Sequence, residues 1–120
     1  MRDYYIKFTK ELTRRGYGRA DIRRLLAYIR PFFEYLDTAT ANTSTGTVTP
    51  GHVCAYVAQV KSACPAGTSM EAVLEANNRL VAVRMFCLQM FVAGYLPHDY
   101  SNGIDYIDLP KSDPASLSNG

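Results

Sequence analysis

Apolar side chains recur at helical spacing in several segments of the chain. Near the N-terminus, Tyr5, Phe8 and Leu12 fall on one face of a helix that we expect over residues 3–15. The next segment predicts a second helix over residues 19–36, because its apolar residues form a stripe about 100° wide. This stripe consists of Ile22, Leu25, Leu26, Ile29, Phe33 and Leu36.

Two further helices are predicted in the second half. Thr49 and Pro50 are typical of an N-cap followed by the first helical position, and we expect this helix over residues 50–63. Ser69 is expected to cap a fourth helix that reaches Ala93. From Leu80 onward this helix is apolar almost all round, which is typical of the buried centre of a bundle.

Turn and loop residues divide these segments. Gly16 and Gly18 are expected to end the first helix, and Pro31 is expected to kink the second. Residues 38–48 form a polar, threonine-rich loop. Residues 97–120 are rich in Asp, Ser, Asn, Pro and Gly and are predicted to be an extended linker, with a helical turn at 104–107 and a disordered end. The fold class is therefore predicted to be all-α, with a four-helix domain over residues 1–96.

Charge is distributed unevenly along the chain. The net charge is only +2, but residues 1–30 hold nine of the 13 Lys and Arg residues against three acids, a local charge of +6. The other ninety residues carry four bases and eight acids. Such a basic segment indicates a polyanionic partner.

Other features narrow the class of protein. No apolar run approaches the roughly 20 residues of a membrane helix, and the N-terminus lacks a secretory signal. The three cysteines cannot all pair, which favours reduced thiols in a cytoplasm. We expect Cys54 and Cys87 to be small core residues.

No catalytic constellation is recognisable. His52 and His98 are not at metal-ligand spacing, and neither a phosphate-binding glycine loop nor a nucleophile motif is present. The sequence therefore predicts no cofactor, no metal site and no enzymatic activity for this chain.

The arginines of the second predicted helix are the main candidates for nucleic-acid binding. Steps of 100° per residue place Arg19, Arg23 and Arg30 on one flank of the apolar stripe, with Ala20 and Ala27 just beyond them. Arginine can grip phosphate or the guanine edge in a bidentate way. Arg24 points to another side, where it is a candidate for backbone contact. The alternative is a solvated surface on which Arg30 pairs with Glu34 four residues later.

The fourth predicted helix adds polar candidates. Asn78 could read adenine, and Arg79 could bind a phosphate. Arg84 lies on the apolar face, and we expect it to form a buried ion pair with Glu34 or Asp37.

Two segments resemble a known family. Residues 16–36 (GYGRADIRRLLAYIRPFFEYL) resemble the second helix of the core-binding, SAM-like domain of tyrosine recombinases, the phage integrase family. Residues 79–86 (RLVAVRMF), followed by Gly94, resemble the fourth helix of that domain. Leu109-Pro-Lys111 and Ser116-Leu-Ser118 resemble its linker to the catalytic domain, which adds Lys111 to the DNA-binding candidates. The chain departs from the family at Gly18 and Asp21, where Ser and Thr are frequent.

The resemblance implies a fold and a role. The fold would be a SAM-like orthogonal bundle that forms half of a clamp around double-stranded DNA, with its second and fourth helices facing the major groove. The catalytic Arg, His and Tyr residues would belong to a following domain of the same full-length protein, which could form a homotetramer on DNA during integration and recombination. About six phosphate contacts would make log affinity fall with log salt at a slope near −5. The alternative is a helical protein-interaction module with a basic docking face.

Overall fold

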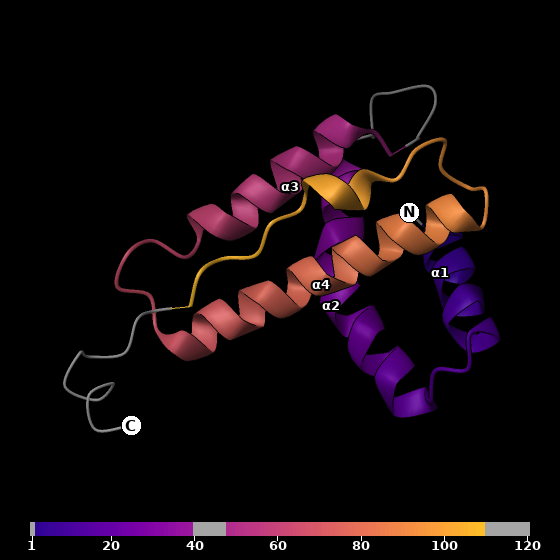
Figure 1. The fold of residues 1–120 in the computed structure, drawn as a ribbon, viewed down its shortest axis with the longest axis horizontal. Coiled ribbons are helices and arrows are strands. Elements are labelled where there is room, and N and C mark those ends of the chain that lie inside the picture. Colours follow the sequence, from indigo (N-terminus) through magenta and orange to yellow (C-terminus); the bar gives the residue numbers. More distant parts are fainter. Residues whose placement is uncertain (1, 40–47, 110–120) are drawn as a thin grey trace.

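The computed structural model describes residues 2–39 and 48–109, and these form an all-helical bundle. Four α-helices are followed by one 3-10 turn, and no strand occurs in the described segments, which confirms the predicted fold class. The helix α2 crosses behind α4, while α3 and α4 follow the long axis of the molecule (Figure 1). The elements are α1 (Arg2–Arg14), α2 (Arg19–Ala39), α3 (Pro50–Ser62), α4 (Met70–Val92) and η1 (Tyr100–Gly103).

The turn between α1 and α2 depends on Gly16. Its φ of +86° lies in the left-handed region, where a residue without a Cβ is favoured. The N–H of Tyr17 donates to the carbonyl of Leu12 at 3.1 Å, and the N–H of Gly16 donates to that of Thr13 at 3.1 Å. These bonds satisfy carbonyls at the end of α1 and lead the chain into α2.

The helix α2 is longer than its apolar stripe predicted. It continues unbroken past Pro31 to Ala39, whereas the sequence indicated an end at Leu36. Phe32 is fully buried as well. The buried side of α2 is therefore wider than the apolar stripe predicted from the sequence.

The start of α3 is held by a capping box, as Thr49 and Pro50 predicted. The Thr49 hydroxyl accepts a hydrogen bond from the His52 backbone N–H, and His52 Nδ1 accepts one from the Thr49 N–H, both at 3.2 Å. The predicted cap of α4 is present as well, since the Ser69 hydroxyl accepts from the Ala72 N–H. Both side chains satisfy backbone donors that a helix start leaves unpaired.

Replacement of Thr49 by alanine is expected to lower the free energy of unfolding by about 1 kcal/mol, because the first turn of α3 loses its side-chain acceptor. Urea denaturation measures the change. Ser62→Ala is the control, since the Ser62 hydroxyl donates to the Gln59 carbonyl near the other end of α3. A Thr49→Ala effect no larger than that of the control would contradict the role of the cap.

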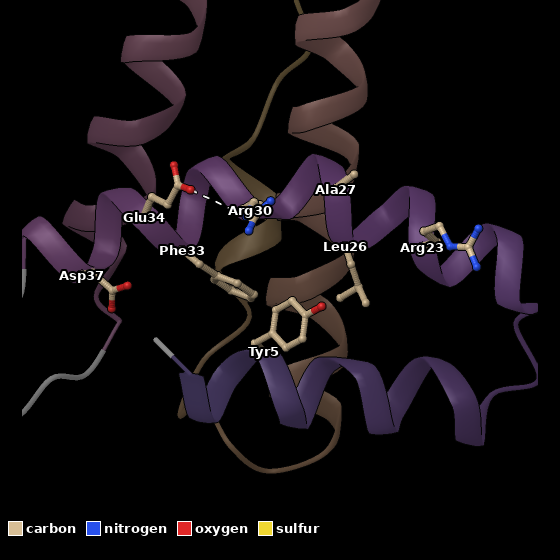
Figure 2. Close-up of a pocket in the computed structure, with 8 residues that line it drawn as sticks. All are labelled: Tyr5, Arg23, Leu26, Ala27, Arg30, Phe33, Glu34 and Asp37. Atoms are coloured by element: carbon tan, nitrogen blue, oxygen red, sulfur yellow. Dashed lines mark ion pairs between the residues drawn. The ribbon is translucent and has the colours of Figure 1, made fainter.

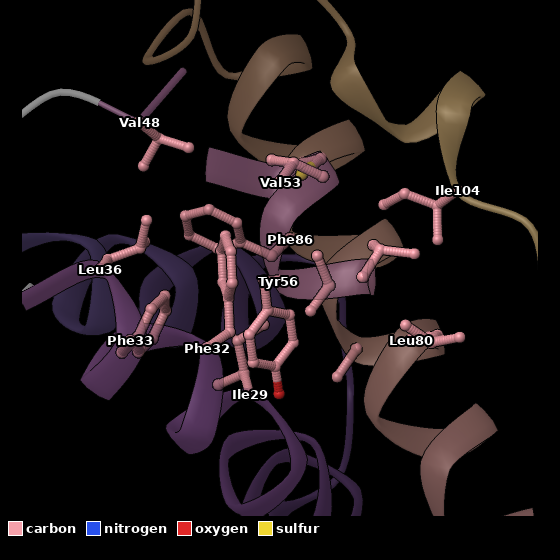
Figure 3. Close-up of a cluster of buried hydrophobic side chains, with 14 of the residues drawn as sticks. Ile29, Phe32, Phe33, Leu36, Val48, Val53, Tyr56, Leu80, Phe86 and Ile104 are labelled. Atoms are coloured by element: carbon pink, nitrogen blue, oxygen red, sulfur yellow. The ribbon is translucent and has the colours of Figure 1, made fainter. Parts of the chain in front are cut away.

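The core forms where the helices cross, and aromatic rings fill its centre (Figure 3). Phe86 of α4 is fully buried and packs nearly edge-to-face against Phe8 of α1, with ring centroids 5.5 Å apart. Tyr56 of α3 packs on Phe32 of α2 at 5.1 Å. Rings from all four helices therefore meet in one cluster.

The segment after α4 packs against the bundle, which corrects the prediction of an extended linker from residue 97. The helical turn lies at Tyr100–Gly103 instead of 104–107, and Ile104 behind it is only 2% exposed. Asn77 of α4 then binds both backbone groups of Ile107, accepting from its N–H at 2.8 Å and donating to its carbonyl at 3.0 Å. The packed chain thus extends beyond the predicted boundary at residue 96. The predictions for 110–120, Lys111 included, lie outside the described residues.

Two predictions of burial are wrong. The C-terminal half of α4 is not covered all round, because Leu88, Phe91 and Val92 are 45%, 40% and 60% exposed. Cys54 is exposed on α3, while Cys87 is buried as expected. Burial raises the pKa of the Cys87 thiol to about 12. None of the described helices has the length and apolar character needed to cross a membrane.

Candidate nucleic-acid interface

The outward side of α2 carries arginines on both sides of a line of small residues. Ala20 and Ala27 are exposed and lie about 20° apart around the helix axis, two turns from each other. Arg24 lies on one side of this line, and three more exposed arginines lie on the other. We call this surface the α2 basic face; it comprises Arg19, Ala20, Arg23, Arg24, Ala27 and Arg30.

Two arginines of the α2 basic face have acidic neighbours. Arg30 Nε lies 3.7 Å from Glu34 Oε1, as the alternative interpretation of the sequence anticipated. Arg24 Nη2 lies 3.5 Å from Asp21 Oδ1. All four side chains are exposed, and ion pairs of this kind contribute little. Either guanidinium could therefore exchange its carboxylate for a phosphate at small cost.

Arg19 and Arg23 are different, because neither forms an ion pair with any residue in the described segments. Both side chains are exposed at the first turns of α2. Their charges are therefore the least compensated of the α2 basic face, and an external anion would meet no local competitor for them.

Three basic residues of α1 and of the turn after it contact other groups of the protein, namely Lys7, Arg14 and Arg15. Arg14 donates two hydrogen bonds to the Glu11 carboxylate, at 3.0 and 2.9 Å, and Arg15 Nε lies 3.7 Å from the same group. The hydrogen bonds from Arg14 lower the pKa of Glu11, and the nearby charges of Arg14 and Arg15 act in the same direction. The Lys7 ammonium lies 4.7 Å from the centroid of the Tyr95 ring. Among the described residues of this segment, the exposed bases without an ion pair or ring contact are Lys10 of α1 and Arg19 and Arg23 of α2.

The structure places the α4 candidates on the other side of α2 from Arg19, Arg23 and Arg30. Asn78 Nδ2 donates to the Tyr28 hydroxyl at 3.4 Å, and that hydroxyl donates to Glu75 at 3.5 Å. Tyr28 follows Arg24 by one helical turn, so these two side chains share a side of α2. Arg24 is thus the arginine of α2 that faces the α4 candidates, a role that sequence phasing had not given it.

Arg79 is exposed above a groove between α2, α3 and α4. Burial raises the pKa of Tyr56 in this groove, and the positive charge of Arg79 offsets part of that rise. Arg79 therefore lies close enough to the Tyr56 hydroxyl to influence it while remaining open to solvent.

The prediction of a buried Arg84 ion pair is wrong. Arg84 is exposed, and its guanidinium carbon lies 5.7 Å from the centroid of the Tyr106 ring. Glu34, one of the expected partners, lies beside Arg30 instead. Arg84 holds the returning segment after η1 by a cation–π contact.

A groove between α1 and α2 adjoins the α2 basic face (Figure 2). Its volume is about 560 Å³, and Tyr5 of α1 points into it toward Phe33 and Leu26 of α2. The sequence placed Tyr5 on the apolar face, but its side chain is 44% exposed. The presence of a tyrosine, Tyr5, at the edge of the apolar face was the only feature of the sequence that pointed to this groove. We call it the α1–α2 groove; it is lined by Tyr5, Arg23, Leu26, Ala27, Arg30, Phe33, Glu34 and Asp37.

Within residues 2–39 and 48–109, no three His, Cys, Asp or Glu side chains lie close enough together to hold a metal ion. Comparison with known protein families, with characterised proteins and with solved structures found no match to this chain. Function is therefore inferred from the chemistry of the α2 basic face.

Proposed function

We propose that the chain binds duplex DNA through the α2 basic face, as the core-binding half-clamp of a site-specific tyrosine recombinase. The observation that carries the proposal is the arrangement of exposed arginines on both sides of Ala20 and Ala27. The resemblance of residues 16–36 and 79–86 to that family's DNA-facing helices supports the same role.

The geometry of α2 suits a major groove. B-DNA's major groove is about 12 Å wide and admits one α-helix. Small side chains at Ala20 and Ala27 let the helix backbone approach the floor of the groove, while longer side chains on either side reach outward. Arg23 and Arg24 could then contact phosphates of opposite strands. From Arg19 to Arg30 the helix rises about 16 Å, which is enough to follow several base pairs.

The helix α4 would extend this contact. Asn78 and Arg79 are exposed on the side of α2 where Arg24 lies. The hydrogen bond from Asn78 to Tyr28 is long at 3.4 Å, so the amide could exchange it for a base edge. Lys111 would add a backbone contact from the linker.

The proposal also assigns the remaining roles in recombination. Cleavage and rejoining of DNA would belong to a catalytic domain that follows this one in the full-length protein, and not to this chain. Tetramer formation would occur on DNA, and the protein would act on the nucleoid in the cytoplasm.

The double variant Arg19→Ala/Arg23→Ala tests the proposal. We expect its affinity for a fluorescein-labelled 30-base-pair duplex to fall at least tenfold, because two charge-assisted phosphate contacts are lost. The slope of log affinity against log salt should become shallower by about 2. Fluorescence anisotropy at several salt concentrations measures both quantities.

The matched control is Lys10→Ala/Lys61→Ala, which removes the same charge from outside the α2 basic face. Its affinity should change less than threefold. If the two double variants bind equally, or if neither alters the affinity and the salt slope, the assignment of Arg19 and Arg23 is wrong.

A protein partner is the second candidate, and the outer side of α4 favours it. Leu74, Leu88 and Val92 are exposed along that side, and exposed apolar patches mark interaction sites in soluble proteins. In this case the α2 basic face would dock an acidic partner. The same titration separates the two candidates, because a docking module with no DNA role would not bind the duplex.

A further inference from the structure

The α1–α2 groove combines an aromatic floor with cationic side chains. Tyr5 and Phe33 contribute rings whose centroids lie 6.3 Å apart at an interplanar angle of 67°. This edge contact holds the Tyr5 ring in place, while 44% of its side chain remains exposed. Arg23 and Arg30 of the α2 basic face line the same groove (Figure 2).

We propose that this groove binds one unpaired nucleotide of the DNA held by the α2 basic face. The base stacks on the ring of Tyr5, and its phosphate lies against Arg23. The inference depends on the proposed DNA-binding function and adds a structural preference to it, for duplexes that contain an unstacked base.

The chemistry of the floor favours a base over a paired backbone. A phosphodiester backbone needs only charge and hydrogen-bond donors, but Tyr5, Leu26 and Phe33 provide an apolar and aromatic surface. Unpaired bases stack on aromatic side chains and on the planes of arginine guanidinium groups. The volume of about 560 Å³ lies within the range of about 300–1,000 Å³ that is typical of small-molecule sites.

The charges along the groove orient the nucleotide. Arg23 lies toward one end, whereas Glu34 and Asp37 lie toward the other (Figure 2). A phosphate is attracted to the Arg23 end and repelled from the acidic end. The base therefore points toward Phe33, where the Glu34 carboxylate can accept a hydrogen bond from its exocyclic amino group.

Arg30 lies between these two ends. Its link to Glu34 is a single exposed contact at 3.7 Å, so it can be given up readily. The released guanidinium can cover the face of the base that Tyr5 leaves free.

The test uses two duplexes of the same sequence, one fully paired and one with a single bulged 2-aminopurine. We expect the 120-residue chain to bind the bulged duplex about tenfold more tightly, and to quench the 2-aminopurine fluorescence as the base stacks. Tyr5→Leu should remove both effects while leaving the affinity for the paired duplex unchanged. Tyr5→Phe keeps a ring and should retain both.

Tyr106→Leu is the matched control, because Tyr106 is 43% exposed and lies outside the α1–α2 groove. If the paired duplex is bound but the bulge gives neither preference nor quenching, the nucleotide site is refuted and the DNA-binding function stands. The nucleotide site is also refuted if Tyr5→Leu and Tyr106→Leu give the same affinity for the bulged duplex and the same 2-aminopurine quenching. If neither duplex is bound, the proposed function fails and the site fails with it.

Discussion

Phe86→Ala is expected to lower the free energy of unfolding by about 3–5 kcal/mol, the range found when a large aromatic side chain is removed from a packed core. Phe86 is fully buried at the point where α1, α2 and α4 meet. Alanine would leave a cavity among rings that come from two other helices and cannot all move inward. The rings lie between 5.2 and 5.9 Å from that of Phe86, and they belong to Tyr4, Phe8, Phe32 and Phe33.

Urea denaturation of the variant measures the loss, with Phe91→Ala as the control on the same helix. Phe91 is 40% exposed, so its removal should cost less than about 1 kcal/mol. Equal losses in the two variants would mean that the core is not centred on Phe86. A large loss for Phe91→Ala alone would mean that the outer side of α4 is covered in solution.

Much of the fold could be predicted because local sequence determines it. The four-residue spacings of Phe8 and Leu12 on α1 and of Ile29 and Phe33 on α2 match the helix period. Thr49 and Ser69 are residues whose side chains cap helix starts. Predicted helix ends differed by one to three residues from those in the structure, because the last turn depends on packing as well as on sequence.

Burial was harder to predict, because it depends on which elements cover a helix. Leu88 and Val92 are residue types that are common in cores, yet they remain 45% and 60% exposed in the described chain. The surroundings of Arg84 could not be predicted from the sequence, because they depend on the path of the segment after η1. That segment returns along α4 and presents Tyr106 to the guanidinium, so no buried carboxylate is needed.

The candidate site was predicted in its residues but not in its arrangement. Helical phasing grouped Arg19 and Arg23 correctly as exposed neighbours. It could not show that α4 lies on the opposite side of α2, because this follows from tertiary contacts such as that between Tyr28 and Asn78. The α1–α2 groove escaped prediction for the same reason, since it requires the relative position of two helices.

Strong salt dependence is the second large effect that we expect. Five exposed arginines, four on α2 and Arg79 on α4, could each displace one counterion from DNA. At about 0.9 ions per contact, log affinity should fall with log salt at a slope of about −4.5. Affinity would therefore fall about 500-fold between 50 and 200 mM salt. A sixth contact from Lys111 would bring the slope to about −5.4.

DNA binding by the α2 basic face is tested by an anisotropy titration of the 120-residue chain against a 30-base-pair duplex at a series of salt concentrations. We expect saturable binding at 50 mM salt and a slope of log affinity against log salt between about −4 and −5.5. Absence of binding at 50 mM salt, or a slope shallower than about −2, would contradict the assignment of the α2 basic face to DNA.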